Sequence, residues 1–160
     1  MGESESGRAA AGAVPLPAAV YGAAGLIPFV ACAIVAWLFA HPWNSYAFEF
    51  QIRYGAVILS FLGAAHWGLA LAGAGAKADA ASACTWTRLG WSVAPALVAW
   101  VSLLMYPTVA LVTQIVGFAA VFFGDIRAVR DGLAPAWYPR LRRPLTAIVV
   151  VSLGAMLLRV

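Results

Sequence analysis

The sequence predicts an all-α integral membrane protein, a bundle of five transmembrane helices with its N-terminus in the cytoplasm. Three observations lead to this prediction. Hydrophobic residues make up 64% of the 160 residues and charged residues only 10%, whereas a soluble domain has about 45–50% and about 25%. Five apolar runs come close to the roughly 20 residues that cross a bilayer as a helix. Basic residues are distributed unevenly between the connecting segments, which indicates the orientation.

Residues 1–16 are mostly small or polar, so we expect a disordered N-terminal tail before the five-helix domain of residues 17–160. The stretch 89–124 has no charge and is too long for one straight helix, and Pro107 divides it into a hairpin. The fifth run is short and requires Arg159 to reach the far interface. The predicted spans are residues 18–40, 48–74, 89–105, 108–124 and 145–160, with approximate ends.

The orientation follows from the positive-inside rule. With five spans, the N-terminal tail and two of the connections share one side. Only Arg53 and Arg159 belong to the other side. The prediction is a multi-pass protein of the bacterial cytoplasmic (inner) membrane. The side of the N-terminus holds eight basic residues: Arg8, Lys77, Arg88, Arg127, Arg130, Arg140, Arg142 and Arg143.

The second span carries the most informative polar groups. Glu49 and Arg53 stand four residues apart, a spacing that pairs them on a helix. They form either an interfacial ion pair or a paired charge that lines a cavity. His66 lies deep in the same span, where we expect a neutral imidazole that is either structural or a ligand-binding group. Small residues that recur every fourth position predict a helix-packing face: Ala56, Ser60, Ala64, Gly68 and Ala72.

Polar residues of three spans form a candidate intramembrane pocket. Gln114 of the fourth span is a plausible hydrogen-bond partner for Ser60 or His66. Pro95 predicts a kink in the third span. The candidate pocket consists of Glu49, Arg53, Ser60, His66, Trp67, Ser92 and Gln114.

The longest predicted loop, residues 125–143, is read as a topology anchor or as a patch that binds lipid or a partner. Gly132 resembles a helix stop, and Pro144 is expected to begin the last helix. The candidate patch consists of Arg127, Arg130, Trp137, Tyr138, Arg140, Arg142 and Arg143.

Catalytic and metal-ligand motifs are absent from the sequence, so a non-enzymatic role is favoured, and whether the protein holds a cofactor is unknown from the sequence. Cys32 lies within the first span and Cys84 in a loop expected on the reducing side, which argues against a disulfide between them. The basic excess reflects topology rather than nucleic-acid binding. The expected partners are the lipid bilayer and a membrane protein or a second copy of the chain.

Three segments together resemble a known family. They are the run from Tyr54 to Gly68, the run from Arg88 to Trp100, and the segment that begins Asp125-x-Arg127 and includes Gly132, Pro135, Trp137-Tyr138 and Leu141-Arg142. This pattern resembles the bacterial membrane domain of unknown function that includes the animal mitochondrial transmembrane protein 69. The resemblance covers roughly residues 18–160. It implies a membrane protein and transfers no functional residue, because the family has no settled activity.

Two hypotheses about function therefore stand. The first is an accessory or assembly factor of an inner-membrane complex, which acts by helix packing with a partner. The second is a small-molecule binder or transporter with a polar intramembrane pocket around Arg53 and His66.

Overall fold

The computed structural model describes residues 13–76 and 85–160, and every regular element in these ranges is a helix. The prediction of an all-α fold is confirmed. Residues 1–12 of the expected tail, and Lys77 and Cys84 of the connection after the second span, lie outside the described residues. The helices are α2 (Leu16–Ala24), α3 (Ile27–Leu38), α4 (Trp43–Ala76), α6 (Trp86–Ser102), α7 (Pro107–Arg130) and α8 (Tyr138–Leu157).

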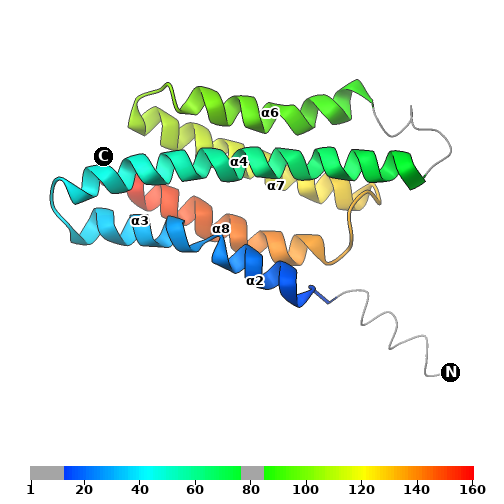
Figure 1. Ribbon diagram of the computed structural model, residues 1–160, viewed down its shortest axis with the longest axis horizontal. Helices are drawn as coiled ribbons and strands as arrows, with labels where there is room; N and C mark the ends of the chain where they lie inside the picture. The colour runs from blue at the N-terminus through cyan, green and yellow to red at the C-terminus, as the bar shows by residue number, and fades with distance from the viewer. Residues whose placement is uncertain (1–12, 77–84) are drawn as a thin grey trace.

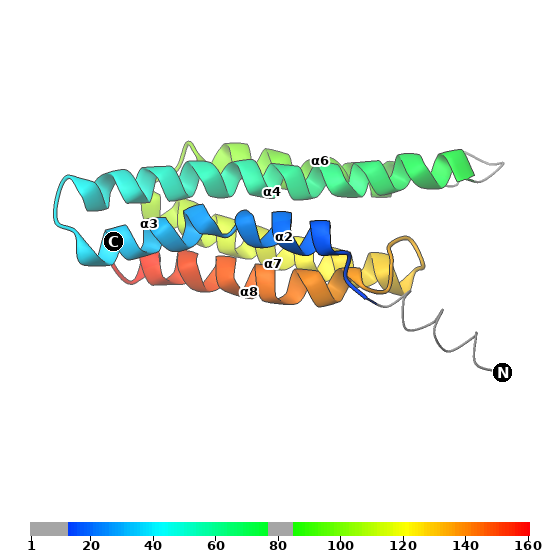
Figure 2. The same cartoon turned by 60° about the horizontal axis from the view of Figure 1, so that its bottom comes forward.

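The helices run along one long axis (Figures 1 and 2). Helix α4 packs against α3, α6 and α7, while α8 packs against α7, α3 and α2. The starts of α2, α6 and α8 and the ends of α4 and α7 meet at one end of the bundle (Figure 1). We call it the basic end, because Arg88, Arg127, Arg130, Arg140 and Arg143 lie at these helix ends.

The first predicted span is not one continuous helix but is divided into α2 and α3. Pro28 causes this break, because it has no N–H for the carbonyl of Ala24, the last residue of α2. The Tyr54 hydroxyl of α4 donates a hydrogen bond of 3.0 Å to the carbonyl of Gly25 at the break. Helix α2 contains no buried residue and packs against α8.

Helices α7 and α8 extend further toward the basic end than the hydropathy indicates. Helix α7 continues to Arg130, past the expected end at residue 124, and ends before Gly132, whose φ is 70°. Helix α8 begins at Tyr138, so Pro144 lies inside it rather than at its start. The reason for both extensions is that the polar residues of this segment pair inside the bundle and do not need a loop in water.

Polar side chains also connect helices at the opposite end of the bundle. Gln114 is fully buried, and its Nε2 donates to the carbonyl of Ile52 at 2.7 Å and to Ser102 Oγ at 3.1 Å. Trp37 Nε1 donates to the carbonyl of Ala155 at 3.1 Å. These bonds join α7 to α4 and α6, and α3 to α8, where the bilayer would offer no hydrophobic gain for packing.

Arg159 lies just after α8. Its guanidinium stands 5.5 Å from the centroid of the Trp37 ring, and its Nε lies 3.4 Å from the carbonyl of Ala36. A cation at the C-terminal end of α3 interacts favourably with the helix dipole. Arg159 is thus held against α3, the helix that precedes the turn into α4.

The close contact between α4 and α6 depends on Gly63. A Cβ at this position would overlap the backbone carbonyl of Ser92, so only glycine permits this approach. The predicted small-residue face does not lie wholly in this contact. Ala56 is buried and Ser60 half-buried, whereas Ala64, Gly68 and Ala72 are exposed on the outside of α4.

Large apolar side chains cover the outside of the bundle, among them Phe61 (67% exposed), Phe123 (61%) and Val151 (69%). In water such a surface would drive aggregation, whereas in lipid it is the expected exterior. Three stretches of the described residues are long and apolar enough to cross a membrane: Leu16–Leu38, Trp43–Ala72 and Pro107–Arg130.

Candidate functional site

Asp125 of α7 is 1% exposed and lies between two cationic or protonatable side chains. Arg142 of α8 donates from Nε to Asp125 Oδ2 at 2.7 Å. On the other side, Nε2 of His66 from α4 lies 2.9 Å from Asp125 Oδ1. The three residues, which we call the buried triad, join three helices at the level of the basic end.

The two contacts of Asp125 differ in quality. The bond from Arg142 is aligned and charge-assisted, and such bonds are roughly twice as strong as neutral ones. His66 Nε2 and Asp125 Oδ1 are close, but the N–H does not point at the oxygen, so neither atom completes a hydrogen bond there. The imidazole, whose side chain is 10% exposed, is therefore held beside the carboxylate by proximity alone.

Tyr138 stands beside the triad, at the start of α8 and before the apolar run of that helix. Burial, followed by the negative charge of Asp125, raises the pKa of Tyr138 to about 12. The phenol is consequently protonated at neutral pH and keeps a donor hydrogen next to the carboxylate.

Two cavities flank the buried triad. His66 lines a cavity of about 450 Å³ between α4, α6 and α7, the His66 cavity. Arg142 lines a separate cavity of about 390 Å³ between α2, α3, α4 and α8, the Arg142 cavity. Asp125 lines neither cavity, but it contacts His66 of the first cavity and Arg142 of the second. Both volumes fall in the range of about 300–1,000 Å³ typical of small-molecule sites.

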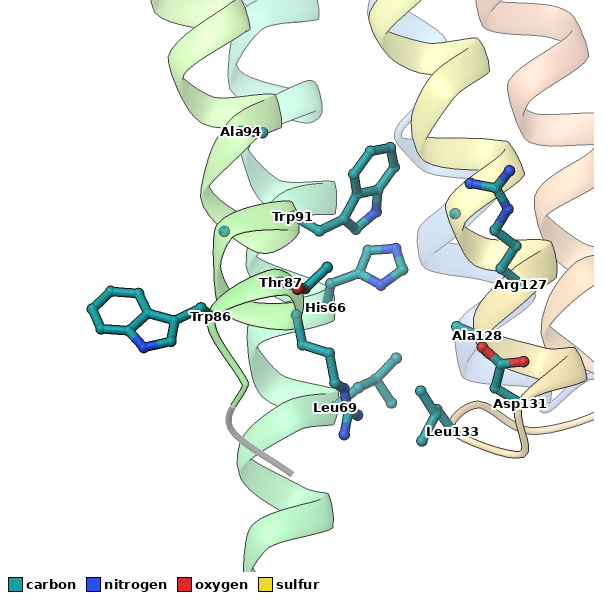
Figure 3. A pocket seen from close by; sticks show the side chains of 13 residues that line it. His66, Leu69, Trp86, Thr87, Trp91, Ala94, Arg127, Ala128, Asp131 and Leu133 are labelled. Atoms are coloured by element: carbon teal, nitrogen blue, oxygen red, sulfur yellow. The ribbon is translucent and has the colours of Figure 1, made fainter. Parts of the chain in front are cut away.

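The His66 cavity has basic and aromatic walls at the basic end (Figure 3). Arg88 and Arg127 line it together with Trp91, and Asp131 is its one lining carboxylate among the described residues. Within residues 13–76 and 85–160, no acidic side chain comes within ion-pair distance of either arginine. The cavity therefore carries an excess of positive charge.

Trp91 is positioned by a glycine on the facing helix. A Cβ on Gly124 would lie 2.6 Å from Trp91 Nε1, so the indole packs directly on the backbone of α7, one residue before Asp125. Figure 3 shows the Trp91 ring between α6 and α7, above His66. The indole thus forms the inner wall of the cavity.

The structure separates the predicted pocket residues into different places. Glu49 and Arg53 form an ion pair of 2.9 Å, with side chains 60% and 66% exposed on the outside of α4. Thirteen residues of helix separate Arg53 from His66, a distance of about 20 Å. The Glu49–Arg53 pair and His66 therefore do not share a cavity.

The other predicted pocket residues bond locally. Ser60 and Ser92 donate to the carbonyls of Ala56 and Arg88, four residues earlier in their own helices. Trp67 is 41% exposed on the outside of α4. Gln114 bonds to Ile52 and Ser102, not to Ser60 or His66. Of the seven residues, His66 alone lines the cavity beside the buried triad.

The predicted lipid or partner patch is divided as well. Arg130, Arg140 and Arg143 are exposed, but Arg142 is 7% exposed and bound to Asp125. Arg127 belongs to the His66 cavity, and Trp137 and Tyr138 line the Arg142 cavity.

The sequence patterns did not identify Asp125 as the buried partner of His66. Asp125 directly follows an apolar run, and Arg142 stands among other arginines, so both resembled loop residues. One signal was available. Asp125 is the only acidic residue between Asp79 and Asp131, and an acid beside a span favours an internal partner.

A helical bundle with an apolar exterior and an internally paired charge cluster defines a helical membrane protein. Residues 14–158 match the family described as "Protein of unknown function (DUF3429)". Since this match covers most of the chain, the protein belongs to that family, and the resemblance found in the sequence is confirmed.

Curated relatives agree with this assignment. The chain is 37% identical to "Transmembrane protein 69" of Xenopus tropicalis over 147 residues, which is 90% of the chain and 54% of the relative. It is 30% identical to "Transmembrane protein 69" of Mus musculus over 141 residues, 86% of the chain and 54% of the relative. The chain thus spans about half the length of these relatives. No solved structure matches it.

Proposed function

We propose that this protein binds a small anionic molecule in the His66 cavity. The observation that supports the proposal is the composition of that cavity, where Arg88 and Arg127 face a space of about 450 Å³ next to His66. Arg127 is exposed and Arg88 half-buried, and neither has an acidic partner among the described residues. Arg also matches carboxylate and phosphate geometry through its planar fork of donors.

The buried triad anchors the inner side of this site, because Nε2 of His66 lies 2.9 Å from Asp125 Oδ1. This proposal keeps the hypothesis of a small-molecule binder or transporter, centres it on His66 and excludes Arg53 from the site.

Anion binding is tested by calorimetric titration of the full chain in detergent. The probes are inorganic phosphate in one arm and mono-, di- and tricarboxylates in the other. Arg127→Gln and Arg88→Gln each remove one cation of the cavity, and we expect at least a tenfold loss of affinity. Arg143→Gln serves as the matched control, because Arg143 does not line the cavity. Equal affinities in the three variants, or no binding of any probe, would contradict the proposal.

We further propose that the chain crosses the bacterial cytoplasmic membrane five times, with its N-terminus inside. Helix α6 has 17 residues and extends about 26 Å. Helix α8 carries its arginines at its basic end and has an apolar run beyond Pro144. In this arrangement the basic end of the bundle faces the cytoplasm, as the positive-inside rule requires.

A second candidate role is packing against a membrane partner, as an accessory or assembly factor or as a homo-oligomer. It is favoured by the outward-facing small residues Ala64, Gly68 and Ala72. A Cβ on Gly68 would meet nothing within 4 Å in the chain itself, so the surface is open to another helix. If a second copy packs there, Gly68→Ile reduces the mass measured by light scattering in mild detergent to that of a monomer. If the wild-type chain already has the mass of a monomer, the homo-oligomer is contradicted.

A further inference from the structure

The Arg142 cavity is a second candidate binding site, on the opposite side of the buried triad from the His66 cavity. It lies beside the break between α2 and α3. Its walls are almost entirely apolar and include Phe29, Phe61 and Leu145. The cavity is a space of about 390 Å³ that no side chain of the described residues fills.

Two polar groups in these apolar walls have no partner. Arg142 Nη2 and Thr146 Oγ1 are buried without a hydrogen bond in the described part of the chain. Both residues are 7% exposed, and both line the cavity one helical turn apart on α8. Buried polar groups are almost always hydrogen-bonded, and an unsatisfied one costs about 1–3 kcal/mol. The pair therefore indicates a ligand atom that accepts hydrogen bonds.

The charges around the Arg142 cavity favour a neutral hydrogen-bond acceptor over an anionic one. Nε of Arg142 is already bonded to Asp125 Oδ2 at 2.7 Å, so the guanidinium is neutralised by a carboxylate. An anionic ligand would place a second negative charge near Asp125 in a medium where like charges repel strongly. A neutral oxygen accepts the hydrogens of Nη2 and Oγ1 without that cost.

We propose that the Arg142 cavity binds a hydrophobic molecule that carries a neutral carbonyl oxygen. The carbonyl accepts from Arg142 Nη2 and Thr146 Oγ1, and the apolar body lies between α2, α4 and α8. Two membrane components have this chemistry: the ester carbonyl of a bilayer phospholipid and the ring carbonyl of an isoprenoid quinone. Thr146 does not line the His66 cavity, so this site and the anion site can fail independently.

The test measures probe binding to the full chain in detergent by native mass spectrometry. The probes are a decyl-substituted benzoquinone, a short-chain phosphatidylcholine and, without an acceptor, decylbenzene. Thr146→Val keeps the shape and removes the hydroxyl, and we expect it to weaken binding of a carbonyl probe about three- to tenfold. It leaves the melting temperature of the empty protein unchanged or higher, because the hydroxyl has no partner to lose.

Ser152→Ala is the matched control, since it removes a buried hydroxyl from α8 outside the cavity. Ala18→Trp fills the cavity from α2 and should abolish binding of every probe. Tighter binding of the quinone or of the phosphatidylcholine identifies the source of the carbonyl. The proposal is overturned if decylbenzene binds as tightly as the carbonyl probes, if Thr146→Val and Ser152→Ala bind equally, or if no probe binds.

Discussion

Asp125 contacts both other members of the buried triad. It is 1% exposed and balances the guanidinium of Arg142, which cannot lose its charge at physiological pH. In low dielectric, each member of such a pair depends on the other. The carboxylate therefore stabilises the fold and neutralises the guanidinium of Arg142, which lines the Arg142 cavity.

Replacing Asp125 with Asn leaves Arg142 buried without a counter-charge. We expect Asp125→Asn to lower the free energy of unfolding in mixed micelles by about 3–5 kcal/mol. Glu49→Gln is the control, because it breaks an ion pair of similar length whose side chains are 60% and 66% exposed. That loss should be at most about 1 kcal/mol. Equal losses of unfolding free energy in the two variants would show that the buried Asp125–Arg142 pair stabilises the fold no more than the exposed pair.

A double-mutant cycle separates the pair from its surroundings. Arg142→Gln added to Asp125→Asn removes the uncompensated charge, so the double variant should be more stable than the sum of the two single losses predicts. Additive losses would mean that the two side chains do not interact through their 2.7 Å contact.

His66 could be singled out from the sequence, but its partners could not. A histidine within an apolar run stands out by composition alone. Asp125 is 59 residues away, and no helical period links the two positions. Arg142 could not be distinguished from Arg140 or Arg143, because only the rotation of α8 decides which of them faces α7. Pairing of this kind is decided by three-dimensional packing.

At the scale of elements, the contact between α4 and α6 depends on which small residue faces the partner helix. The sequence shows that small residues recur in α4, but it does not show which of them face α6. Gly63, one position before the predicted Ala64, meets the backbone of Ser92, whereas Gly68 faces outward. Since Ala and Gly are frequent throughout α4, several faces fitted the same pattern.

Two glycine substitutions in α4 test this assignment. At Gly63 a Cβ meets a backbone carbonyl that cannot move cheaply, so Gly63→Ala should lower the free energy of unfolding by about 1–3 kcal/mol. At Gly68 a Cβ has open space, so Gly68→Ala should raise it by about 0.5–1 kcal/mol through helix propensity. Unfolding in mixed micelles measures both. Effects of the same sign would contradict the packing described for α4 and α6.

At the scale of the whole molecule, the length and hydropathy of the helices indicate three membrane spans, whereas the buried ion pair favours five. Hydropathy over the described helices gives three candidate spans, since α6 has only 17 residues and α8 contains Arg140, Arg142 and Arg143. The buried triad favours five. Arg142 is neutralised by Asp125 inside the bundle, so α8 enters the membrane with one cation fewer exposed to lipid.

The two alternatives place the connections of α7 on opposite sides, which cysteine labelling in intact cells distinguishes. Starting from Cys32→Ala and Cys84→Ala, Leu104→Cys marks the exposed turn before α7, and Ala136→Cys marks the exposed connection after it. With five spans and the N-terminus inside, a membrane-impermeant maleimide labels the Leu104→Cys variant from outside. It labels the Ala136→Cys variant only after the cells are permeabilised. Labelling of both variants in permeabilised cells is the control that both thiols can react. If only Leu16–Leu38, Trp43–Ala72 and Pro107–Arg130 cross, the pattern is reversed, because α6 then stays on the side of the N-terminus.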